Sequence, residues 1–188
     1  MTIHMADIAE QPIDERHLRN ALGRFATGVT VITTRAPSGK PEGLTANSFT
    51  AVSLHPPLVS WSLKRAAPSY AGFLAADHFA VNILAADQLA LCRHFATPLA
   101  DKFAGIPHAD GLHGAPILAG CLASFDCRTE TTIEGGDHQI FIGRVMRATY
   151  RDGEPLIFSA GRLCLPALIV ETTPAGPDGF LSENWEGL

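Results

Sequence analysis

The sequence predicts a mostly β domain, in which short helices pack around a closed antiparallel barrel. Several stretches of strand length are rich in β-branched and apolar residues and are bounded by Gly, Pro, Asn or Asp. Only three short segments place their apolar residues at helical spacing. These helical segments do not alternate regularly with the strands, which disfavours a parallel sheet built from βαβ units. The pattern alone leaves the order of the strands open.

The first predicted element is a helix that begins at Asp14. An aspartate is well suited to cap the free N–H groups of a first helical turn. Leu18, Leu22 and Phe25 then follow at helical spacing, and the helix is expected to end before Gly28. Because these apolar residues share one face, we expect the helix to lie against the barrel.

A β-hairpin is predicted next. The β-branched residues of segment 29–34 are typical of a strand, and the Pro-rich and Gly-rich segment 37–41 predicts a turn into a second strand. After this hairpin the pattern predicts a strand over 58–63, a short helix over 68–76 and a strand over 79–84.

The second half begins with a helix capped by Asp87 that carries Leu89, Leu91, Cys92 and Phe95 on its apolar face. The segment 112–118 is predicted to be a loop, because Gly and Pro interrupt it. Two long alternating stretches predict the best antiparallel pair in the chain. They cover 121–132 and 139–150, with a turn over 134–138, and a last strand is predicted over 156–159.

Length and composition indicate one domain with one core. The chain has 188 residues, of which 46% are hydrophobic and 18% charged. We expect an N-terminal mobile arm over 1–13, the domain over 14–171 and an irregular tail over 172–188. The net charge of −5 argues against a nucleic-acid partner, which would require a clustered basic excess.

The cysteines and the N-terminus argue against metal-binding, secreted and membrane-spanning proteins. Four cysteines show no C-x-x-C pair and no Cys/His ligand spacing, so no metal site is expected and the thiols are predicted to be reduced. The N-terminus lacks a signal-peptide pattern, and no run reaches the roughly 18 apolar residues of a membrane helix. We therefore expect a cytoplasmic protein with no membrane partner.

Small and hydroxylated residues concentrate between Gly43 and Ser69. Backbone N–H groups can approach a ligand closely in the run 43–48, because no bulky side chain holds the ligand off. Lys64 and Arg65 follow the next predicted strand and add positive charge. This combination is typical of a phosphate pocket. The alternative is a glycine at a β-bulge and a solvated basic strand end.

Five motifs resemble, in order and spacing, the short-chain flavin reductase family. They are TGVTVITT at 27–34, GLTANSFTAVSLHPPLV at 43–59, FAVNIL at 79–84, DKFAGI at 101–106 and GGDH at 135–138. The resemblance covers roughly 18–165. It implies a split β-barrel of the FMN-binding type, a homodimer, and NADH- or NADPH-dependent reduction of FMN or FAD. Reduced flavin would then pass to a separate flavin-dependent monooxygenase.

The resemblance also implies site residues. The predicted cofactor-binding set is Gly43, Leu44, Thr45, Ala46, Asn47, Ser48, Ser62, Leu63, Lys64, Arg65, Ser69, His94, Phe95 and Lys102. The predicted NAD(P)H-binding set is Gly136, Asp137, His138, Phe158, Gly161 and Arg162, with His138 as the catalytic candidate that orients the nucleotide or stabilises charge. In isolation the GGDH turn would be an ordinary surface turn.

One position departs from the family pattern. Family members commonly have an arginine directly before the phenylalanine that matches Phe95, whereas this chain has His94 there and Arg93 one residue earlier. A shift of one residue turns a side chain by about 100° around a helix. Which of the two residues takes the role of the family arginine is therefore left open.

Hydride transfer from nicotinamide to flavin requires positioning rather than a covalent nucleophile. Two other functions are kept open by the sequence. One is an FMN-dependent oxidase of the pyridoxamine-phosphate-oxidase type, and the other is a flavin-binding or electron-relay protein without enzymatic activity. Trp61 is predicted to pack in the core or at a dimer contact rather than on the flavin, and Trp185 likewise.

Overall fold

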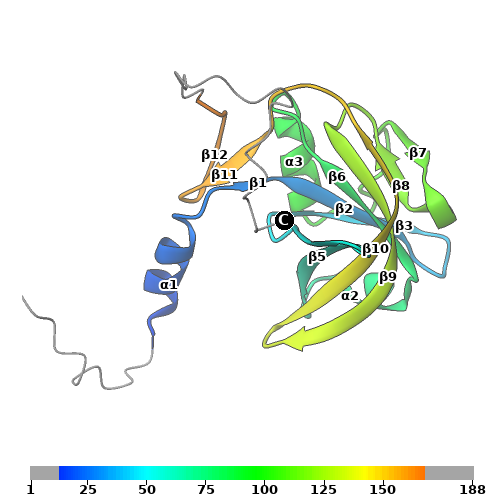
Figure 1. Cartoon of the computed structure of the whole chain (residues 1–188), viewed down its shortest axis with the longest axis horizontal. Helices are drawn as coiled ribbons and strands as arrows, with labels where there is room; N and C mark the ends of the chain where they lie inside the picture. The colour runs from blue at the N-terminus through cyan, green and yellow to red at the C-terminus, as the bar shows by residue number, and fades with distance from the viewer. Residues whose placement is uncertain (1–12, 168–188) are drawn as a thin grey trace, which may run out of the picture.

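A seven-stranded antiparallel sheet, in the order β3-β2-β6-β9-β10-β5-β4, is the main structural unit of the chain. The computed structural model describes residues 13–167 (Figure 1). The predicted arm, apart from Ile13, the predicted tail over 172–188 and Trp185 lie outside the described residues. The strands of this sheet are β2 (Thr30–Arg35), β3 (Pro41–Ala46), β4 (Thr50–Leu54), β5 (Pro57–Lys64), β6 (His78–Ile83), β9 (Ala123–Gly135) and β10 (His138–Tyr150).

Smaller elements surround this sheet. A three-stranded sheet contains β1 (Thr27–Gly28), β11 (Ile157–Ser159) and β12 (Arg162–Cys164), and a two-stranded one contains β7 (His108–Asp110) and β8 (Pro116–Leu118). A short 3-10 helix, η2 (Leu112–Gly114), joins β7 to β8. The α-helices are α1 (Glu15–Leu22), α2 (Tyr70–Ala75) and α3 (Leu89–Ala96). Within residues 13–167, no helix is long and apolar enough to cross a membrane.

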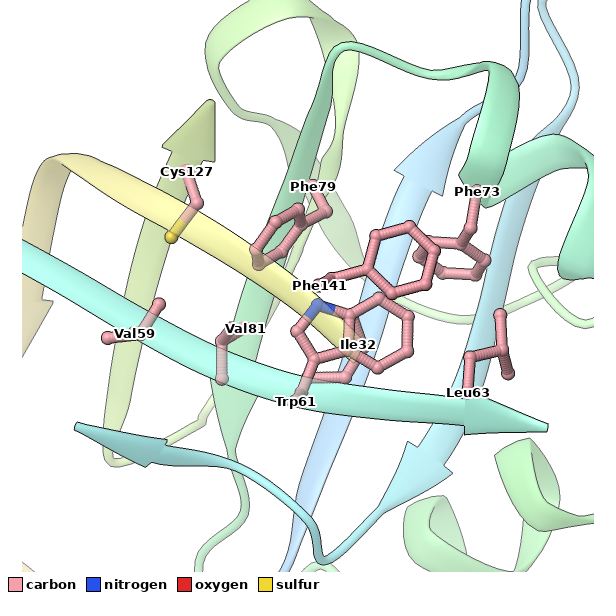
Figure 2. Packing of buried hydrophobic residues seen from close by; sticks show 9 residues of the cluster. All are labelled: Ile32, Val59, Trp61, Leu63, Phe73, Phe79, Val81, Cys127 and Phe141. Carbon is pink, nitrogen blue, oxygen red and sulfur yellow. The ribbon is translucent and has the colours of Figure 1, made fainter. Parts of the chain in front are cut away.

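The sheet curls into a barrel around an aromatic core. Trp61 of β5 and Ile32 of β2 belong to one buried cluster, although three strands separate β5 from β2 in the sheet order (Figure 2). The Trp61 ring stacks on Phe141 at 4.6 Å between centroids. β3 and β4 are the two edges of the sheet and do not pair with each other. The predicted split barrel is therefore confirmed, with its opening between β3 and β4.

A second buried cluster covers the outer face of β2. Side chains alternate across a strand, so Val31 points away from the barrel interior that Ile32 occupies. Val31 packs with Phe95 of α3 and with Phe103. This cluster fixes α3 beside β3, and that position decides where a ligand can bind.

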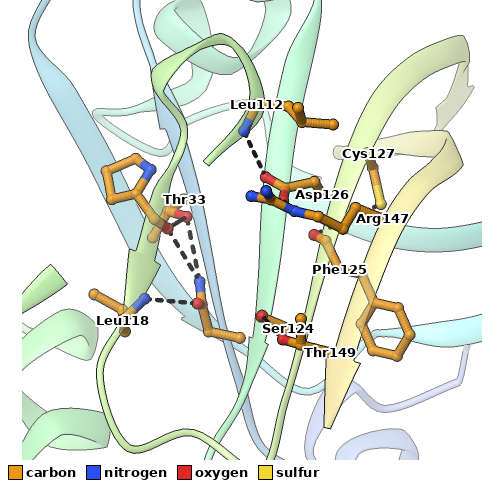
Figure 3. Close-up of polar contacts among 11 residues, drawn as sticks. Thr33, Leu112, Leu118, Ser124, Phe125, Asp126, Cys127, Arg147 and Thr149 are labelled. Carbon is orange, nitrogen blue, oxygen red and sulfur yellow. Dashed lines mark hydrogen bonds and ion pairs between the residues drawn. The ribbon is translucent and has the colours of Figure 1, made fainter. Parts of the chain in front are cut away.

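The β7–β8 hairpin is anchored by polar residues (Figure 3). Asp126 of β9 accepts a hydrogen bond from the Leu112 N–H at 2.9 Å and pairs with Arg147 at 2.6 Å. The carbonyl oxygen of Pro116 accepts a hydrogen bond from the Thr33 hydroxyl. The prediction of a loop over 112–118 is therefore partly wrong, because 116–118 form β8.

The predicted first helix is confirmed, but it ends at Leu22, before the predicted apolar position Phe25, and its predicted packing is wrong. The Asp14 carboxylate accepts a hydrogen bond from the His17 N–H at 2.8 Å, as expected for a cap. None of the residues of α1 is buried, and Leu22 and Phe25 are 65% and 78% exposed. Figure 1 shows α1 projecting away from the barrel. An amphipathic pattern identifies an apolar face but not the surface that covers it.

Two further boundaries differ from the prediction. The N-cap of α3 is Gln88 rather than Asp87, and its side-chain Oε1 accepts a hydrogen bond from the Ala85 N–H at 3.0 Å. The turn between β9 and β10 is also shorter than predicted. Because Gly135 pairs with His138, only Gly136 and Asp137 form it, and Gly136 has the positive φ of +65° that such a tight turn requires.

Candidate functional site

A pocket of about 560 Å³ runs along the free edge of β3, and we call it the large pocket. Its walls come from β3, the loop before α2, the end of α3 and the segment after it. The lining residues are Lys40, Pro41, Glu42, Gly43, Leu44, Thr45, Ala67, Pro68, Ser69, Phe95, Ala96, Pro98, Leu99, Ala100 and Lys102. Six members of the predicted cofactor-binding set meet here: Gly43, Leu44, Thr45, Ser69, Phe95 and Lys102.

Gly43 is a glycine because β3 lies very close to α3. A Cβ atom at this position would stand 2.8 Å from Cε1 of Phe95 and 3.2 Å from Cζ of Phe103. Both rings belong to the buried cluster beneath α3 and have little room to move. The glycine therefore lets the edge strand and the helix form one continuous pocket wall.

Lys102 fastens the same two elements. Its Nζ donates hydrogen bonds to the carbonyl oxygens of Gly43 at 3.1 Å and of Phe95 at 2.7 Å. Burial lowers the pKa of the Lys102 ammonium. The Gly43 carbonyl thus points away from β2, as expected for an edge strand whose outward-facing backbone groups have no partner strand.

A second pocket of about 260 Å³, the small pocket, adjoins the large pocket at Thr45. Its lining is mostly apolar, with one amide and one guanidinium among the side chains. The residues are Val29, Thr45, Ala46, Asn47, Cys92, Arg93, Ala96, Phe158 and Leu163. Thr45 and Ala96 line both pockets, and the Thr45 hydroxyl donates to the Cys92 carbonyl oxygen at 2.7 Å. The pockets therefore adjoin each other where β3 meets α3.

The neighbouring Arg93 and His94 have different surroundings. His94 Nε2 lies 2.7 Å from the Lys102 carbonyl oxygen, so the imidazole helps to hold the segment after α3. Arg93 is exposed and lines the small pocket. The geometry thus leaves Arg93 as the residue of the pair whose side chain is available to a ligand.

Three other members of the predicted set are engaged within the protein. The Ser48 hydroxyl accepts a hydrogen bond from the Ser62 N–H at 3.0 Å and donates to the Ser62 carbonyl at 3.2 Å. This pair attaches the link between β3 and β4 to β5. The Leu63 side chain is 1% exposed and packs in the barrel core, so it cannot form part of a pocket wall.

Lys64 and Arg65 lie beside the β9–β10 turn. Lys64 is opposite His138 in the strand register and its Nζ lies 3.9 Å from Asp137 Oδ2, while Arg65 pairs with Glu134. His138 Nδ1 is 2.7 Å from Asp137 Oδ1. The hydrogen bond from His138 is the main cause that lowers the pKa of the Asp137 carboxyl. Lys64 lowers it further.

The predicted NAD(P)H-binding set falls into two separate groups. Gly136, Asp137 and His138 belong to the β9–β10 turn, whereas Phe158, Gly161 and Arg162 belong to β11, β12 and the turn between them. Figure 1 shows these two regions apart from each other, with the β9–β10 turn at the lower left of the barrel and β11 and β12 beside β1 at the upper left. Of the six residues, only Phe158 lines either pocket.

The sequence did not predict Glu42 and Lys40 as members of the large pocket. It also did not decide between Arg93 and His94 as the residue that takes the role of the family arginine. Glu42 is adjacent to the Gly43 run, and on an edge strand the neighbours of a close-approach glycine also border the ligand. That adjacency was the available signal. No sequence signal predicts Leu99 and Ala100 as pocket residues, because their position depends on the path of the chain after α3.

The described residues contain no group of three or more His, Cys, Asp or Glu arranged to hold a metal ion. All four cysteines are free thiols, of which Cys92 and Cys127 are buried. Burial raises the pKa of the Cys127 thiol to about 12. A thiol with such a pKa stays protonated at neutral pH and is a poor nucleophile.

Comparisons with known proteins agree on one family. The family model for the flavin reductase like domain matches residues 22–165. The FMN reductase (NADH) SmoA of Agrobacterium fabrum (strain C58 / ATCC 33970) is 45% identical over 79% of this chain and 84% of its own length. The flavin-dependent monooxygenase reductase subunit HsaB of Rhodococcus jostii (strain RHA1) is 42% identical over 82% of this chain and 80% of its own.

A solved structure gives the same answer. The Streptomyces globisporus C-1027 NADH:FAD oxidoreductase SgcE6, in complex with NAD and FAD fragments, matches with a TM-score of 0.79 and 41% identity. The match covers 84% of this chain and 96% of that one. From its split barrel, its motifs and these relatives, we conclude that the chain belongs to the flavin reductase like domain family.

Proposed function

We propose that this protein is an NADH-dependent flavin reductase that reduces FMN or FAD and supplies reduced flavin to a separate flavin-dependent monooxygenase. One observation carries the proposal: the edge strand β3, the loop at Ser69 and the end of α3 converge on one large pocket. Relatives named as an NADH-dependent FMN reductase, a monooxygenase reductase subunit and an NADH:FAD oxidoreductase support it.

The large pocket fits a flavin in size and chemistry. Its volume of about 560 Å³ lies within the range of roughly 300–1,000 Å³ that is typical of small-molecule sites. Leu44, Phe95 and Leu99 give it apolar walls for an aromatic ring. The backbone of β3 and the Ser69 hydroxyl supply polar groups along one side.

A bound flavin would supply the ring that accepts a hydride from the dihydronicotinamide. The residues of this chain position it. Outward-facing N–H groups on β3 are suited to hold a ring edge where negative charge develops. Gly43 keeps that edge within reach, and Lys102 keeps β3 in place. Pro98, Leu99 and Ala100 line another part of the pocket with apolar groups.

The nicotinamide nucleotide would be oriented by His138. Its imidazole is partly exposed and is held by Asp137 through Nδ1, while Nε2 makes no hydrogen bond to any residue in 13–167. Phe158 and Arg93 on the small pocket provide an apolar face and a cation for the same ligand. NADPH in place of NADH is a variation that these contacts allow.

We further propose that the protein is a homodimer. In the described chain, Leu18, Leu22 and Phe25 on and after α1 and Val52 and Leu54 on the edge strand β4 are exposed apolar side chains. A second copy would cover such surfaces and would bring the two groups of NAD(P)H-binding residues closer together. Sedimentation velocity tests this, with a dimer expected for the wild type and a monomer for Phe25→Ser. The cytoplasm, which contains the NADH pool, is the proposed compartment.

The test of the function is reduction of excess flavin. The purified chain is mixed anaerobically with NADH and a large excess of FMN or FAD, and the flavin absorbance is followed. We expect multiple turnovers of bleaching. Bound flavin that does not turn over with NADH would indicate an electron-relay protein. Reduction by an amine instead of NADH would indicate an oxidase, and either result would overturn the proposal.

A further inference from the structure

Three apolar residues after α3, Pro98, Leu99 and Ala100, line the large pocket and are also exposed to solvent. Leu99 is 45% exposed, although its side of the pocket is otherwise apolar. None of the three makes a hydrogen bond with any other residue in 13–167. Because no hydrogen bond holds it, the 98–100 segment can change position without breaking one.

Both ends of the 98–100 segment are fixed to α3. On the N-terminal side, Thr97 donates a hydrogen bond from its hydroxyl to the Arg93 carbonyl oxygen at 2.8 Å and one from its N–H to the His94 carbonyl oxygen at 3.2 Å. On the C-terminal side, the Lys102 ammonium donates to the Phe95 carbonyl oxygen at 2.7 Å, and the Lys102 carbonyl oxygen lies 2.7 Å from His94 Nε2. The segment therefore starts and ends at the same part of α3, as a compact surface loop does.

The other walls of the large pocket are held by backbone hydrogen bonds. β3 pairs with β2 along its length. The Ala67 N–H donates to the Lys64 carbonyl oxygen at 2.9 Å, and the Ser69 carbonyl oxygen accepts from the Phe73 N–H at 3.1 Å. Movement of these walls would break hydrogen bonds, whereas movement of the 98–100 segment would not. We therefore expect any change in the width of the pocket to occur at this segment.

The side chain of Leu99 provides a driving force for closure. A flavin ring is flat and largely apolar, and contact with it would remove the exposed part of Leu99 from water. Closure costs conformational entropy. This cost is reduced by Pro98, because a proline has a fixed φ and therefore fewer conformations to lose.

We propose that the 98–100 segment acts as a flap, which closes over the bound flavin, buries Leu99 against it and reopens to release it. This inference rests on the proposed function, which places the flavin in the large pocket. Reduced flavin has to leave the protein before a separate monooxygenase can use it. Opening of the flap then sets the rate of flavin release, and product release limits kcat in many enzymes.

Stopped-flow binding of FMN in the absence of NADH tests the closure step. Quenching of flavin fluorescence reports binding, and the observed rate is followed as the concentration of protein, in excess over FMN, is raised. A flap that closes after the first encounter gives a rate that reaches a plateau, because closure becomes limiting. A rigid wall gives a rate that rises in proportion to the protein concentration, and that result would overturn the inference.

Two flap variants act on closure in different ways. Leu99→Ser removes the side chain that covers the flavin, and we expect the dissociation rate of FMN, measured after rapid dilution of the complex, to rise about 10-fold. Pro98→Gly keeps Leu99 but gives the open flap more conformations, so a rise of about threefold is expected. Leu165→Ser is the matched control, because Leu165 is exposed and lines neither pocket, and its rate should equal that of the wild type.

An unchanged dissociation rate in Leu99→Ser would show that this side chain does not cover the flavin. A rise in Leu99→Ser without any rise in Pro98→Gly would indicate a fixed contact, and either result overturns the inference. The binding experiments contain no NADH, so they separate this inference from the proposed function. A chain that binds FMN with a plateau but does not bleach it with NADH contradicts the proposed function alone, and a chain that reduces flavin but binds it in one linear step contradicts the flap alone.

Discussion

Lys102 and Gly43 are joined by a hydrogen bond of 3.1 Å from the lysine Nζ to the backbone carbonyl oxygen of the glycine. A second bond of 2.7 Å from the same Nζ ends on the Phe95 carbonyl. An ammonium has three donors, so Lys102 uses two of them to tie the edge strand to α3. A lysine that the sequence indicates as cofactor-binding is thus first a structural brace of the pocket.

Removing this brace should weaken the fold. Lys102→Met keeps the aliphatic stem but leaves two carbonyl oxygens without a donor, and we expect the free energy of unfolding to fall by about 2 kcal/mol. Urea denaturation measures it. Lys40→Met is the control, since Lys40 lines the same pocket but is exposed. Equal stability of the two variants would contradict the structural role.

Gly43→Ala should destabilise the protein through a steric clash. The added methyl group would meet the Phe95 ring at 2.8 Å, and such overpacking typically costs about 1–3 kcal/mol. Gly28→Ala is a matched control, because a Cβ there would meet nothing within 4 Å. Thermal denaturation of both variants checks the prediction. A Gly43 variant as stable as the Gly28 variant would mean that the rings move aside.

Substitutions of Arg93 and of His94 should have different effects, the first on NADH binding and the second on stability. Arg93→Gln removes the cation of the small pocket, and we expect the KM for NADH to rise by about 10-fold while FMN affinity is unchanged. His94→Gln disturbs the contact with the Lys102 carbonyl, so its main effect should be on stability. Steady-state kinetics and urea denaturation separate the two. Weaker FMN binding in Arg93→Gln would instead assign this residue to the flavin phosphate.

His138→Ala should lower kcat by about 10-fold with little change in flavin affinity, a loss typical of a misplaced reactant. Asp137→Asn weakens the hold on the imidazole and should produce a smaller loss in the same direction. His55→Gln is the control, because His55 is exposed and lies outside both pockets. An unchanged rate at saturating NADH would remove His138 from the mechanism.

Stability should fall in mild acid because of His78. Its ring stacks on His113 with centroids 3.5 Å apart. Burial and then His113 lower the pKa of His78 below that of the unfolded chain, against a smaller opposing effect of Asp77. The unfolded chain therefore binds more protons below its own pKa of about 6.5, so stability is full above that pH and declines below it.

His78→Phe keeps the stacked ring but cannot be protonated. We expect it to reduce the loss of unfolding free energy between pH 7.5 and pH 5.5, measured by urea denaturation at both values. His55→Phe, at an exposed histidine, should leave that loss as it is in the wild type. An identical loss in all three proteins would exclude His78 as its source.

The sequence predicted elements whose signals are local. The hairpin of β2 and β3 and the long pair of β9 and β10 follow from alternation and from Gly and Pro in turns. The meeting of Gly43, Ser69 and Lys102 in one pocket was predicted through resemblance, since these residues are far apart in the chain.

Features that depend on distant contacts escaped prediction. β8 is only three residues long and is held by Thr33 and Asn82 from other strands. The exposure of α1 depends on whether another surface packs against its apolar face. An amphipathic pattern does not indicate such a surface. The different surroundings of Arg93 and His94 depend on the rotation of α3 against β3.

The buried position of Trp61 gives this protein an internal optical reporter. Its indole is 0% exposed, packs against Phe73, Phe79 and Phe141, and makes no hydrogen bond through Nε1 within the described residues. An indole in such dry surroundings emits at short wavelength, where flavins absorb. Energy transfer to a nearby flavin would quench that emission. In a Trp185→Phe variant, Trp61 is the remaining tryptophan, so the fall in its fluorescence would measure flavin binding.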